Sequence, residues 1–243
     1  MVKIIAIWGG EIREKTTLDI DKEIIRFSGK KNPKILFIPT ASSDSEWYFS
    51  SIKQNFESIW WIVDVLYLIK ENLSIKEISE KILSSDIIYV GGGNTLKMMT
   101  LWRKLWVDKI LDQALEKDIV LCGLSAGSMC WFTYGQSDSR KLIHHDQFIK
   151  VTWLGYISAL HCPHYNSEIY RDKDLKRMMR KTTWVAIALE DNCAIQIQND
   201  TYRIITSNEN AKAYRIYWKE GKYYKEQIQK TQEFLSLENI LKK

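Results

Sequence analysis

The residues best suited to chemistry lie in the segment "DIVLCGLSAGSMCWF", residues 118–132. Ser125 stands between Gly123 and Gly127, directly after an apolar run, and the five residues match the pattern G-x-S-x-G. This pattern is typical of a nucleophile elbow, a sharp strand-to-helix turn that exposes a serine hydroxyl. The next backbone N–H, that of Ala126, would then face a developing oxyanion. A small residue in a tight turn is the alternative, and the strand before it favours the nucleophile.

A second glycine-rich turn, "VGGGNT" at residues 90–95, also follows an apolar run. Such turns between a strand and a helix bind anions, so a phosphate cradle is a rival interpretation. The segment lacks the G-K-[ST] ending of a P-loop and the spacing of a dinucleotide fingerprint. If Ser125 is a nucleophile, the N–H of Gly92 or Gly93 would supply the second oxyanion donor, and Asn94 joins them as a substrate-binding candidate.

A serine nucleophile needs a base, and the chain has four histidines. His144 and His145 lie in the polar segment "SRKLIHHDQF", whereas His161 and His164 frame "HCPHY", just beyond the apolar run "YISAL". His164 follows Pro163 and precedes an aromatic residue, as expected for a loop residue held at the end of a strand. The pattern therefore favours His164 over the other three.

A third group must orient the imidazole of the base. Glu190 ends the apolar run "WVAIALE", and Asp138 lies in "YGQSDSR", on the loop after the predicted elbow helix. Because either carboxylate would stand near the expected site, the pattern does not separate them. Both stay candidates.

The apolar runs predict an α/β fold. Continuous rather than alternating apolar strands indicate a parallel sheet covered on both faces, in which the two glycine-rich turns share the edge where ligands bind. The strands are expected at residues 3–9, 33–42, 61–69, 86–90 and 118–123, and the helices at 19–28, 45–59, 74–85, after 94, at 105–116 and after the elbow, with Met129 and Trp131–Phe132 packing down. Short runs at 183–190, 193–198, 201–207, 212–218 and 222–228 predict an antiparallel extension of the same sheet, followed by a helix at 231–241.

Bulk properties restrict the class of protein. With 243 residues, 45% hydrophobic and 27% charged, the chain is expected to form a single globular domain over 1–243. The net charge of +5 is spread along the chain, and its densest group, "RDKDLKRMMRK" at 171–181, is interpreted as a solvated helix face rather than a nucleic-acid patch. No run approaches a membrane span, and no signal-peptide pattern is present, so the cytoplasm is the expected location.

The four cysteines have no metal-ligand or disulfide-framework spacing, so the sequence predicts neither a metal site nor a cofactor. A monomer and a homodimer both stay open.

The motifs "VGGGNT", "GLSAGS", "CPHY" and "LED", in this order over about residues 86–195, resemble the dipeptidase E group of serine peptidases, whose family includes cyanophycinases. The resemblance implies a flavodoxin-like three-layer α/β sandwich related to class I glutamine amidotransferases, and a metal-independent serine peptidase. It further implies Ser125 as nucleophile, His164 as base, Gly93 and Ala126 as oxyanion donors, and either Asp138 or Glu190 as the third triad member.

Two departures bear on specificity. Amidotransferases have a cysteine at the elbow and an acid two residues after the histidine, where this chain has Ser125 and Asn166, so glutamine amide chemistry is disfavoured. Aspartyl dipeptidases of the group use an arginine beyond the histidine to bind an N-terminal aspartate. Arg171 and Arg177 lie in that region, but their segment does not match the family pattern, so a preference for aspartate does not follow.

The leading hypothesis is therefore serine-dependent hydrolysis of short peptides, as in a dipeptidase or aminopeptidase. An esterase of the α/β-hydrolase fold is disfavoured, because only 39 residues separate Ser125 from His164 and the chain beyond is antiparallel in pattern. A non-catalytic protein that holds a small anion on "GGGNT" is the alternative outside enzymes.

Overall fold

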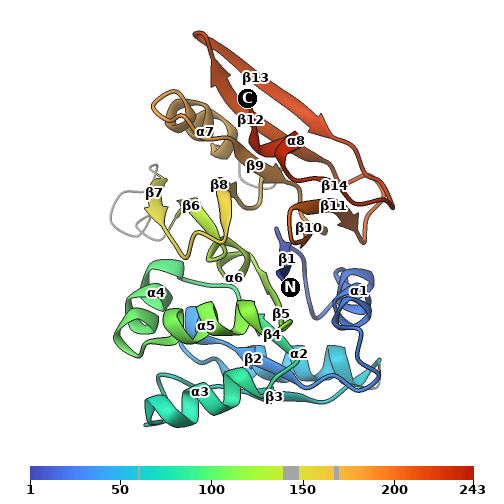
Figure 1. Ribbon diagram of the computed structural model, residues 1–243, viewed down its shortest axis with the longest axis vertical. Coiled ribbons are helices and arrows are strands. Elements are labelled where there is room, and N and C mark those ends of the chain that lie inside the picture. Colours follow the sequence, from blue (N-terminus) through green and yellow to red (C-terminus); the bar gives the residue numbers. More distant parts are fainter. Residues whose placement is uncertain (60, 139–147, 167–169) are drawn as a thin grey trace.

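The computed structural model describes residues 1–59, 61–138, 148–166 and 170–243. Helices and two mixed β-sheets, one of eight strands and one of six, make up an α/β fold (Figure 1). The predicted α/β class is therefore confirmed, and the flavodoxin-like three-layer arrangement stays a prediction. The eight-stranded sheet holds all five of the predicted parallel strands, and the six-stranded sheet is an addition that the pattern did not predict.

The eight-stranded sheet has a parallel part and an antiparallel part. Its order is β14-β11-β10-β1-β5-β4-β2-β3. The strands from β1 to β3 in this order are parallel, and β10, β11 and β14 pair antiparallel on the other side of β1. The bounds are β1 (Lys3–Ile7), β2 (Ile35–Ile38), β3 (Val63–Val65), β4 (Ile87–Val90), β5 (Val120–Leu124), β10 (Cys193–Gln198), β11 (Thr201–Thr206) and β14 (Leu235–Ser236).

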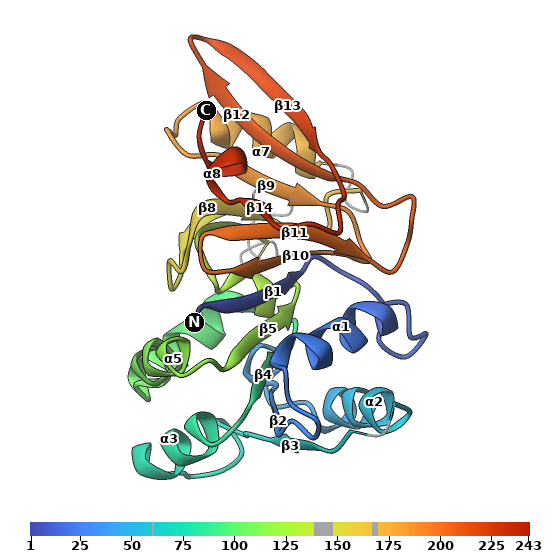
Figure 2. The same cartoon turned by 45° about the vertical axis from the view of Figure 1, so that its right-hand side comes forward.

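Helices cover both faces of the parallel strands (Figure 2). On one face, α1 (Leu18–Ser28) and α2 (Glu46–Glu57) pack against a core that includes Ile5, Phe37 and Tyr89. On the other face, α3 (Ile75–Leu83), α4 (Thr95–Lys104) and α5 (Val107–Glu116) contribute to a larger core with Ile4 and Trp102. This burial of both faces is why β2, β4, β5 and the part of β1 after Lys3 consist of apolar residues without alternation.

The six-stranded sheet has the order β13-β12-β9-β8-β6-β7, with β6, β8 and β9 parallel. Its inner face shares the larger core with the first sheet, and its outer face packs on α7 (Arg171–Met179) through Leu160, Leu175 and Met179. The strands are β6 (Phe132–Ser137), β7 (Ile149–Thr152), β8 (Ile157–Cys162), β9 (Ala186–Leu189), β12 (Ala213–Lys219) and β13 (Lys222–Ile228).

Three expectations about the second half of the chain were wrong. Of the predicted antiparallel strands, only 193–198 and 201–207 extend the first sheet, whereas the other three belong to the second. The helix expected at 231–241 is the short β14 followed by α8 (Glu238–Leu241). The elbow helix α6 (Ala126–Met129) is a single turn, because the apolar Phe132 starts β6 and packs in the core between the sheets.

Among the described residues, no helix is both long and apolar enough to cross a membrane.

Local sequence signals determine the helix boundaries where they are strong. The Ser74 side chain accepts from the Glu77 backbone N–H, and the Glu77 carboxylate accepts from the Ser74 N–H at 2.8 Å, which completes a capping box at the start of α3.

We expect Ser74→Ala to lower the free energy of unfolding by about 1 kcal/mol in urea denaturation, because the first turn loses its side-chain acceptor. Ser84→Ala, at the exposed other end of α3, is the matched control and should change it by less than about 0.5 kcal/mol. Equal losses in the two variants would contradict the assignment.

Candidate active site

Ser125 stands on a strained turn at the end of β5. Its backbone has φ 53° and ψ −110°, a region that non-glycine residues rarely occupy. The Ser125 N–H still donates to the Ile7 carbonyl of β1 at 3.0 Å, and the Ser125 carbonyl accepts from the N–H groups of Ser128 and Met129. The turn is therefore held at both ends, and Ser125 is half-buried at the carboxyl edge of the parallel strands.

The glycines on either side of Ser125 make room for the chain of β4. A Cβ on Gly127 would lie 2.1 Å from the carbonyl oxygen of Val90, and one on Gly123 would lie 2.5 Å from the carbonyl oxygen of Gly127. Real Cβ atoms do not approach so closely. The G-x-S-x-G pattern thus has a steric cause here: β4 passes directly against the elbow.

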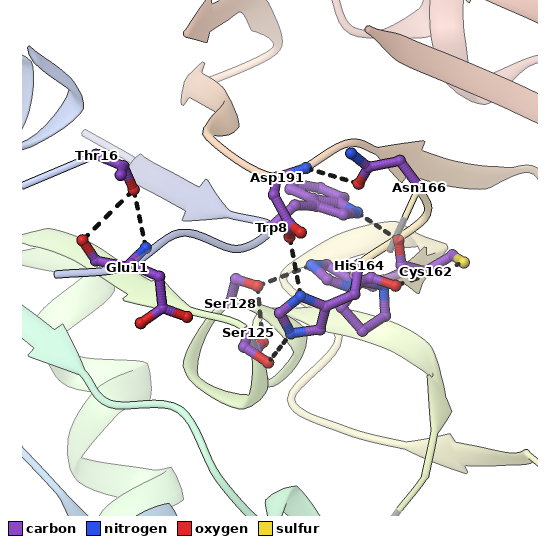
Figure 3. A network of polar contacts seen from close by, with 11 residues as sticks. Trp8, Glu11, Thr16, Ser125, Ser128, Cys162, His164, Asn166 and Asp191 are labelled. Atoms are coloured by element: carbon purple, nitrogen blue, oxygen red, sulfur yellow. Dashed lines mark hydrogen bonds and ion pairs between the residues drawn. The ribbon is translucent and has the colours of Figure 1, made fainter. Parts of the chain in front are cut away.

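His164 lies beyond the end of β8, in the second sheet, and its imidazole reaches across to Ser125. Ser125 Oγ and His164 Nε2 are 2.8 Å apart (Figure 3). The His164 backbone also has positive φ, 49°, and the next residue's N–H, that of Tyr165, donates to the Leu189 carbonyl. The structure thus brings together the two residues that the sequence predicted as nucleophile and base.

The acid beside His164 is Asp191. His164 Nδ1 and Asp191 Oδ1 are 2.9 Å apart, and both side chains are about a quarter to a third exposed, at 30% and 25%. Because the carboxylate can only accept, Nδ1 carries the proton and the lone pair of Nε2 faces the Ser125 hydroxyl. The Asp191 N–H in turn donates to the Asn166 side chain at 3.1 Å, so Asn166 helps to position the acid.

The two acids predicted from the sequence lie elsewhere. The Glu190 carboxylate accepts from the Lys212 N–H at 3.0 Å, which joins the end of β9 to the strand beside it. Asp138 is exposed just beyond β6. Sequence reasoning missed Asp191 because it took the strand-end residue of "LED" rather than its neighbour in the turn. His144 and His145 lie outside the described residues.

Gly9, at the end of β1, leaves the space in which Asp191 meets His164. A Cβ at this position would lie 1.7 Å from Asp191 Oδ1 and 2.8 Å from His164 Nδ1. The backbone around Gly9 holds the same turn, since its carbonyl accepts from the Asn192 N–H at 2.9 Å. The side-chain-free position is therefore needed for contact rather than for backbone freedom.

The four predicted oxyanion and substrate-binding residues divide into two pairs. The Gly92 N–H donates to Tyr48 Oη at 3.1 Å, so it is already bonded and Gly93 is the better of the two expected donors. The Asn94 N–H donates to the Ala41 carbonyl at 2.7 Å. Asn94 instead caps α4, its side chain accepting from the Lys97 N–H.

Within the described part of the chain, the N–H groups of Gly93 and Ala126 donate to no protein acceptor. The glycine turn does abut the elbow, because a Cβ on Gly92 would lie 3.5 Å from that of Ser125. Gly93 and Ala126 therefore remain the candidate donors.

His161 is a buried structural partner of the elbow. Ser128 Oγ donates to the Ser125 carbonyl and lies 2.8 Å from His161 Nε2, so that nitrogen must be the donor of the pair. The ring stacks on Trp8 with centroids 4.0 Å apart. Burial, followed by the nearby charges of Arg171 and His164, lowers the pKa of His161 well below its usual value. This histidine is neutral, and it supports the turn through its hydrogen bond to Ser128.

Other chemistries find less support in the described residues. All four cysteines are buried and free, and burial raises the pKa of the Cys122 and Cys130 thiols well above the usual value. No group of three or more histidine, cysteine, aspartate or glutamate side chains in the described ranges is placed to hold a metal ion. Arg171 is buried on α7 and donates to the Gln136 carbonyl, and Arg177 pairs with Asp174.

Residues 4–205 match Peptidase family S51. The chain belongs to this family. It is 33% identical over 219 residues to the uncharacterized peptidase YgaJ of Bacillus subtilis, which covers 89% of this chain and 92% of that one. It is also 25% identical over 199 residues to the uncharacterized peptidase PM1590 of Pasteurella multocida, covering 78% and 93% of the two chains.

Two solved structures share the fold of this S51 family member. A peptidase from an acI-B1 Actinobacterium aligns with a TM-score of 0.72 at 20% identity, covering 97% of each chain. A putative peptidase E protein from Listeria monocytogenes aligns with a TM-score of 0.64 at 21% identity, covering 85% of this chain and 98% of that one. The resemblance seen in the motifs is thereby confirmed, and membership of a peptidase family supports peptide hydrolysis as the activity.

The space at Gly9 can be tested through the reactivity of Ser125. We expect Gly9→Ala to slow the labelling of Ser125 by a fluorophosphonate probe by about a hundredfold, because the added methyl displaces Asp191 from His164 and the base loses its orientation. The rate is measured by intact-protein mass spectrometry. Gly29→Ala is the control, because a Cβ there meets no atom within 4 Å, although its positive φ costs some stability. Equal labelling of Gly9→Ala and wild type would contradict the steric role.

His161 predicts a pH dependence of stability. Its folded-state pKa lies below the value near 6.5 in the unfolded chain, so below pH 6.5 the unfolded state binds a proton that the folded state does not. The free energy of unfolding should therefore fall by up to about 1.4 kcal/mol per pH unit from this group, until the folded pKa is reached. His161→Gln keeps a donor for Ser128 and removes the titration, so its denaturation curves should show a shallower loss below pH 6.5. Parallel pH profiles would rule the effect out.

Proposed function

We propose that this S51 family member is a serine peptidase that cleaves short peptides with Ser125 as nucleophile, His164 as general base and Asp191 as the acid that orients it. The observation that carries the proposal is the continuous chain of two hydrogen bonds, 2.8 and 2.9 Å, that starts on the strained elbow serine. A serine in a turn that needed only a small residue would not require a strained backbone, an imidazole and a carboxylate in line.

The residues would act in two half-reactions. In the first, Ser125 Oγ attacks the peptide carbonyl carbon while His164 Nε2 takes the hydroxyl proton, and the carboxylate of Asp191 stabilises the imidazolium. The N–H groups of Gly93 and Ala126 would stabilise the oxyanion of the tetrahedral intermediate. Collapse breaks the C–N bond, and His164 passes its proton to the leaving amine.

In the second half-reaction, water takes the place of the amine. His164 removes a proton from the water as it attacks the acyl-serine, and the second tetrahedral intermediate collapses to release the carboxylic acid and restore the Ser125 hydroxyl. No bound cofactor enters either half-reaction. The preference for short peptides rests on the likeness to the dipeptidase E group, in line with the peptidase E name of the Listeria structure.

A dipeptide library compared between wild type and Ser125→Ala tests the activity. We expect wild type to release amino acids from part of the library, and Ser125→Ala to lower kcat by at least about a thousandfold, because the acyl-enzyme can no longer form. Chromatography of the released amino acids measures both. A binding protein without catalysis would leave the library intact and Ser125 unlabelled by a fluorophosphonate, and wild-type turnover by Ser125→Ala would refute the mechanism.

The identity of the acid has its own controls in the same assay. Asp191→Asn should lower kcat by about a hundredfold or more, since the amide no longer fixes the Nδ1–H tautomer. Asp138→Asn and Glu190→Gln, the two acids that the sequence favoured, should stay within about twofold of wild type.

A further inference from the structure

A cavity of about 330 Å³ lies beside the nucleophile. The loop after β1 forms one wall, through residues 10–13, and the start of α2 with the residues before it forms the other, through Ser42, Ser45, Trp47, Tyr48 and Ser51. Leu124, the residue before Ser125, closes the inner end. The volume is at the small end of the range for ligand sites and suits a group of one or two amino acids.

Tyr48 connects this cavity to the reacting atoms. Its hydroxyl accepts the Gly92 N–H, and Gly92 abuts Ser125 as described above. A Cβ on Gly92 would lie 3.7 Å from the Tyr48 hydroxyl oxygen and 3.5 Å from the Ser125 Cβ. A substrate carbonyl placed at Ser125 would therefore extend one of its neighbouring groups into the cavity.

Only Glu11 and Arg13 among the lining residues carry a charge. The Arg13 guanidinium is stacked 3.7 Å above the Trp47 ring, a cation–π contact that holds it at the outer wall. Within the described residues, the Glu11 carboxylate has no hydrogen-bond donor. Two serine hydroxyls are already committed as donors, Ser42 to Pro39 and Ser51 to Trp47. The cavity thus offers one negatively charged hydrogen-bond acceptor, the Glu11 carboxylate.

The loop holds the backbone of Glu11 in a fixed place, and the side chain is exposed. Its N–H donates to Thr16 Oγ1 at 2.8 Å, and its carbonyl accepts the Thr16 N–H at 3.2 Å. Ile12, the next residue, is buried in the core, and Gly10 before it has φ +146°, which side chains rarely adopt. Figure 3 shows the carboxylate turned away from Thr16, toward the side on which Ser125 lies.

The charge of Glu11 is also felt at the cavity wall. Burial is the main cause that raises the pKa of Tyr48 to about 12, and the carboxylates of Asp21 and Glu11 add to it. This places the Glu11 carboxylate within electrostatic reach of the hydroxyl that borders Gly92.

We propose that the cavity is a substrate subsite in which the Glu11 carboxylate binds an ammonium group of the peptide whose carbonyl Ser125 attacks. The proposal rests on the proposed peptidase function. A carboxylate and a hydroxyl-lined wall recognise a cationic donor, and a substrate carboxylate would meet the repulsion of Glu11. Glu11 is therefore a specificity residue and takes no part in bond breaking.

The ammonium has two possible sources, the free α-amine of the substrate and the side chain of a lysine. Four peptides separate them: lysyl-alanine, norleucyl-alanine and the Nα-acetyl form of each. Norleucine has the lysine stem without the charge, and acetylation removes the α-ammonium alone. A Glu11 effect on both free-amine peptides identifies the α-amine, and an effect on both lysyl peptides identifies the side chain.

We expect Glu11→Gln to lower kcat/KM about tenfold or more on the two peptides that carry the ammonium group bound by Glu11. The effect should come chiefly through KM, because the charge-assisted hydrogen bond between Glu11 and that ammonium group is lost. On acetyl-norleucyl-alanine the variant should match wild type. Glu14→Gln, exposed on the same loop and outside the cavity, is the matched control and should match wild type on all four. Urea denaturation shows whether Glu11→Gln keeps the wild-type stability.

Two results would overturn the subsite. One is equal kcat/KM of Glu11→Gln and wild type on every peptide that carries an ammonium group. The other is a wild-type preference for aspartyl-alanine that Arg13→Gln abolishes, which would make Arg13 the recognising group.

Binding separates failure of the subsite from failure of the proposed function. Calorimetry with lysinamide and norleucinamide needs no turnover, and both carry the α-ammonium. If wild type cleaves no peptide but binds either amide at least about tenfold more tightly than Glu11→Gln does, the subsite stands and the peptidase function falls. If neither amide binds wild type and no peptide is cleaved, the subsite falls as well.

Discussion

The site depends on one close approach, between the end of β1 and the turn that carries the chain from β9 to β10. Ser125 belongs to the eight-stranded sheet and His164 to the end of a strand in the six-stranded sheet, and Asp191 lies where the chain crosses between them. The Asp191 and His164 side chains meet in the space left by Gly9. Because each side chain comes from a different element, the hydrogen-bonded chain forms only when the two sheets are packed together.

This packing also holds the strain of the site. Ser125, His164 and Asn192 all have positive φ without being glycine, at a cost of about 1–3 kcal/mol each. Each strained segment is tied by a backbone bond: Ser125 to Ile7, Asn192 to Gly9, and the residue after His164 to Leu189. The acceptors lie on or directly after β1 and at the end of β9, whose inward-facing side chains share the larger core. Burial of apolar surface between the sheets thus offsets the strain at their common edge.

Local signals explain what could be predicted from the sequence. The capping box of α3, the apolar strands of the parallel part and the elbow pattern depend on neighbouring residues, and they lie where expected. Which sheet an antiparallel strand joins depends on long-range packing, and the runs at 193–198 and 212–218 look alike although they belong to different sheets. Asp191 could not be identified from the sequence for the same reason, since its contact with His164 depends on long-range packing. Glu190 and Asp191 both follow an apolar run, and only the direction of the crossover turns one toward Lys212 and the other toward His164.

Charge balance around His164 explains why a second histidine can lie so close. During the proposed reaction His164 becomes an imidazolium, and any further positive charge nearby would oppose that step. His161 is within electrostatic reach, yet its stacking on Trp8 and its complete burial keep it neutral. Its one described hydrogen bond joins it to Ser128, which in turn donates to the carbonyl of Ser125, so His161 supports Ser125 without adding charge. In the proposed mechanism Asp191 is the charged partner that the imidazolium contacts directly, and the two histidines of "HCPHY" differ in role: His164 would transfer a proton, and His161 stays neutral.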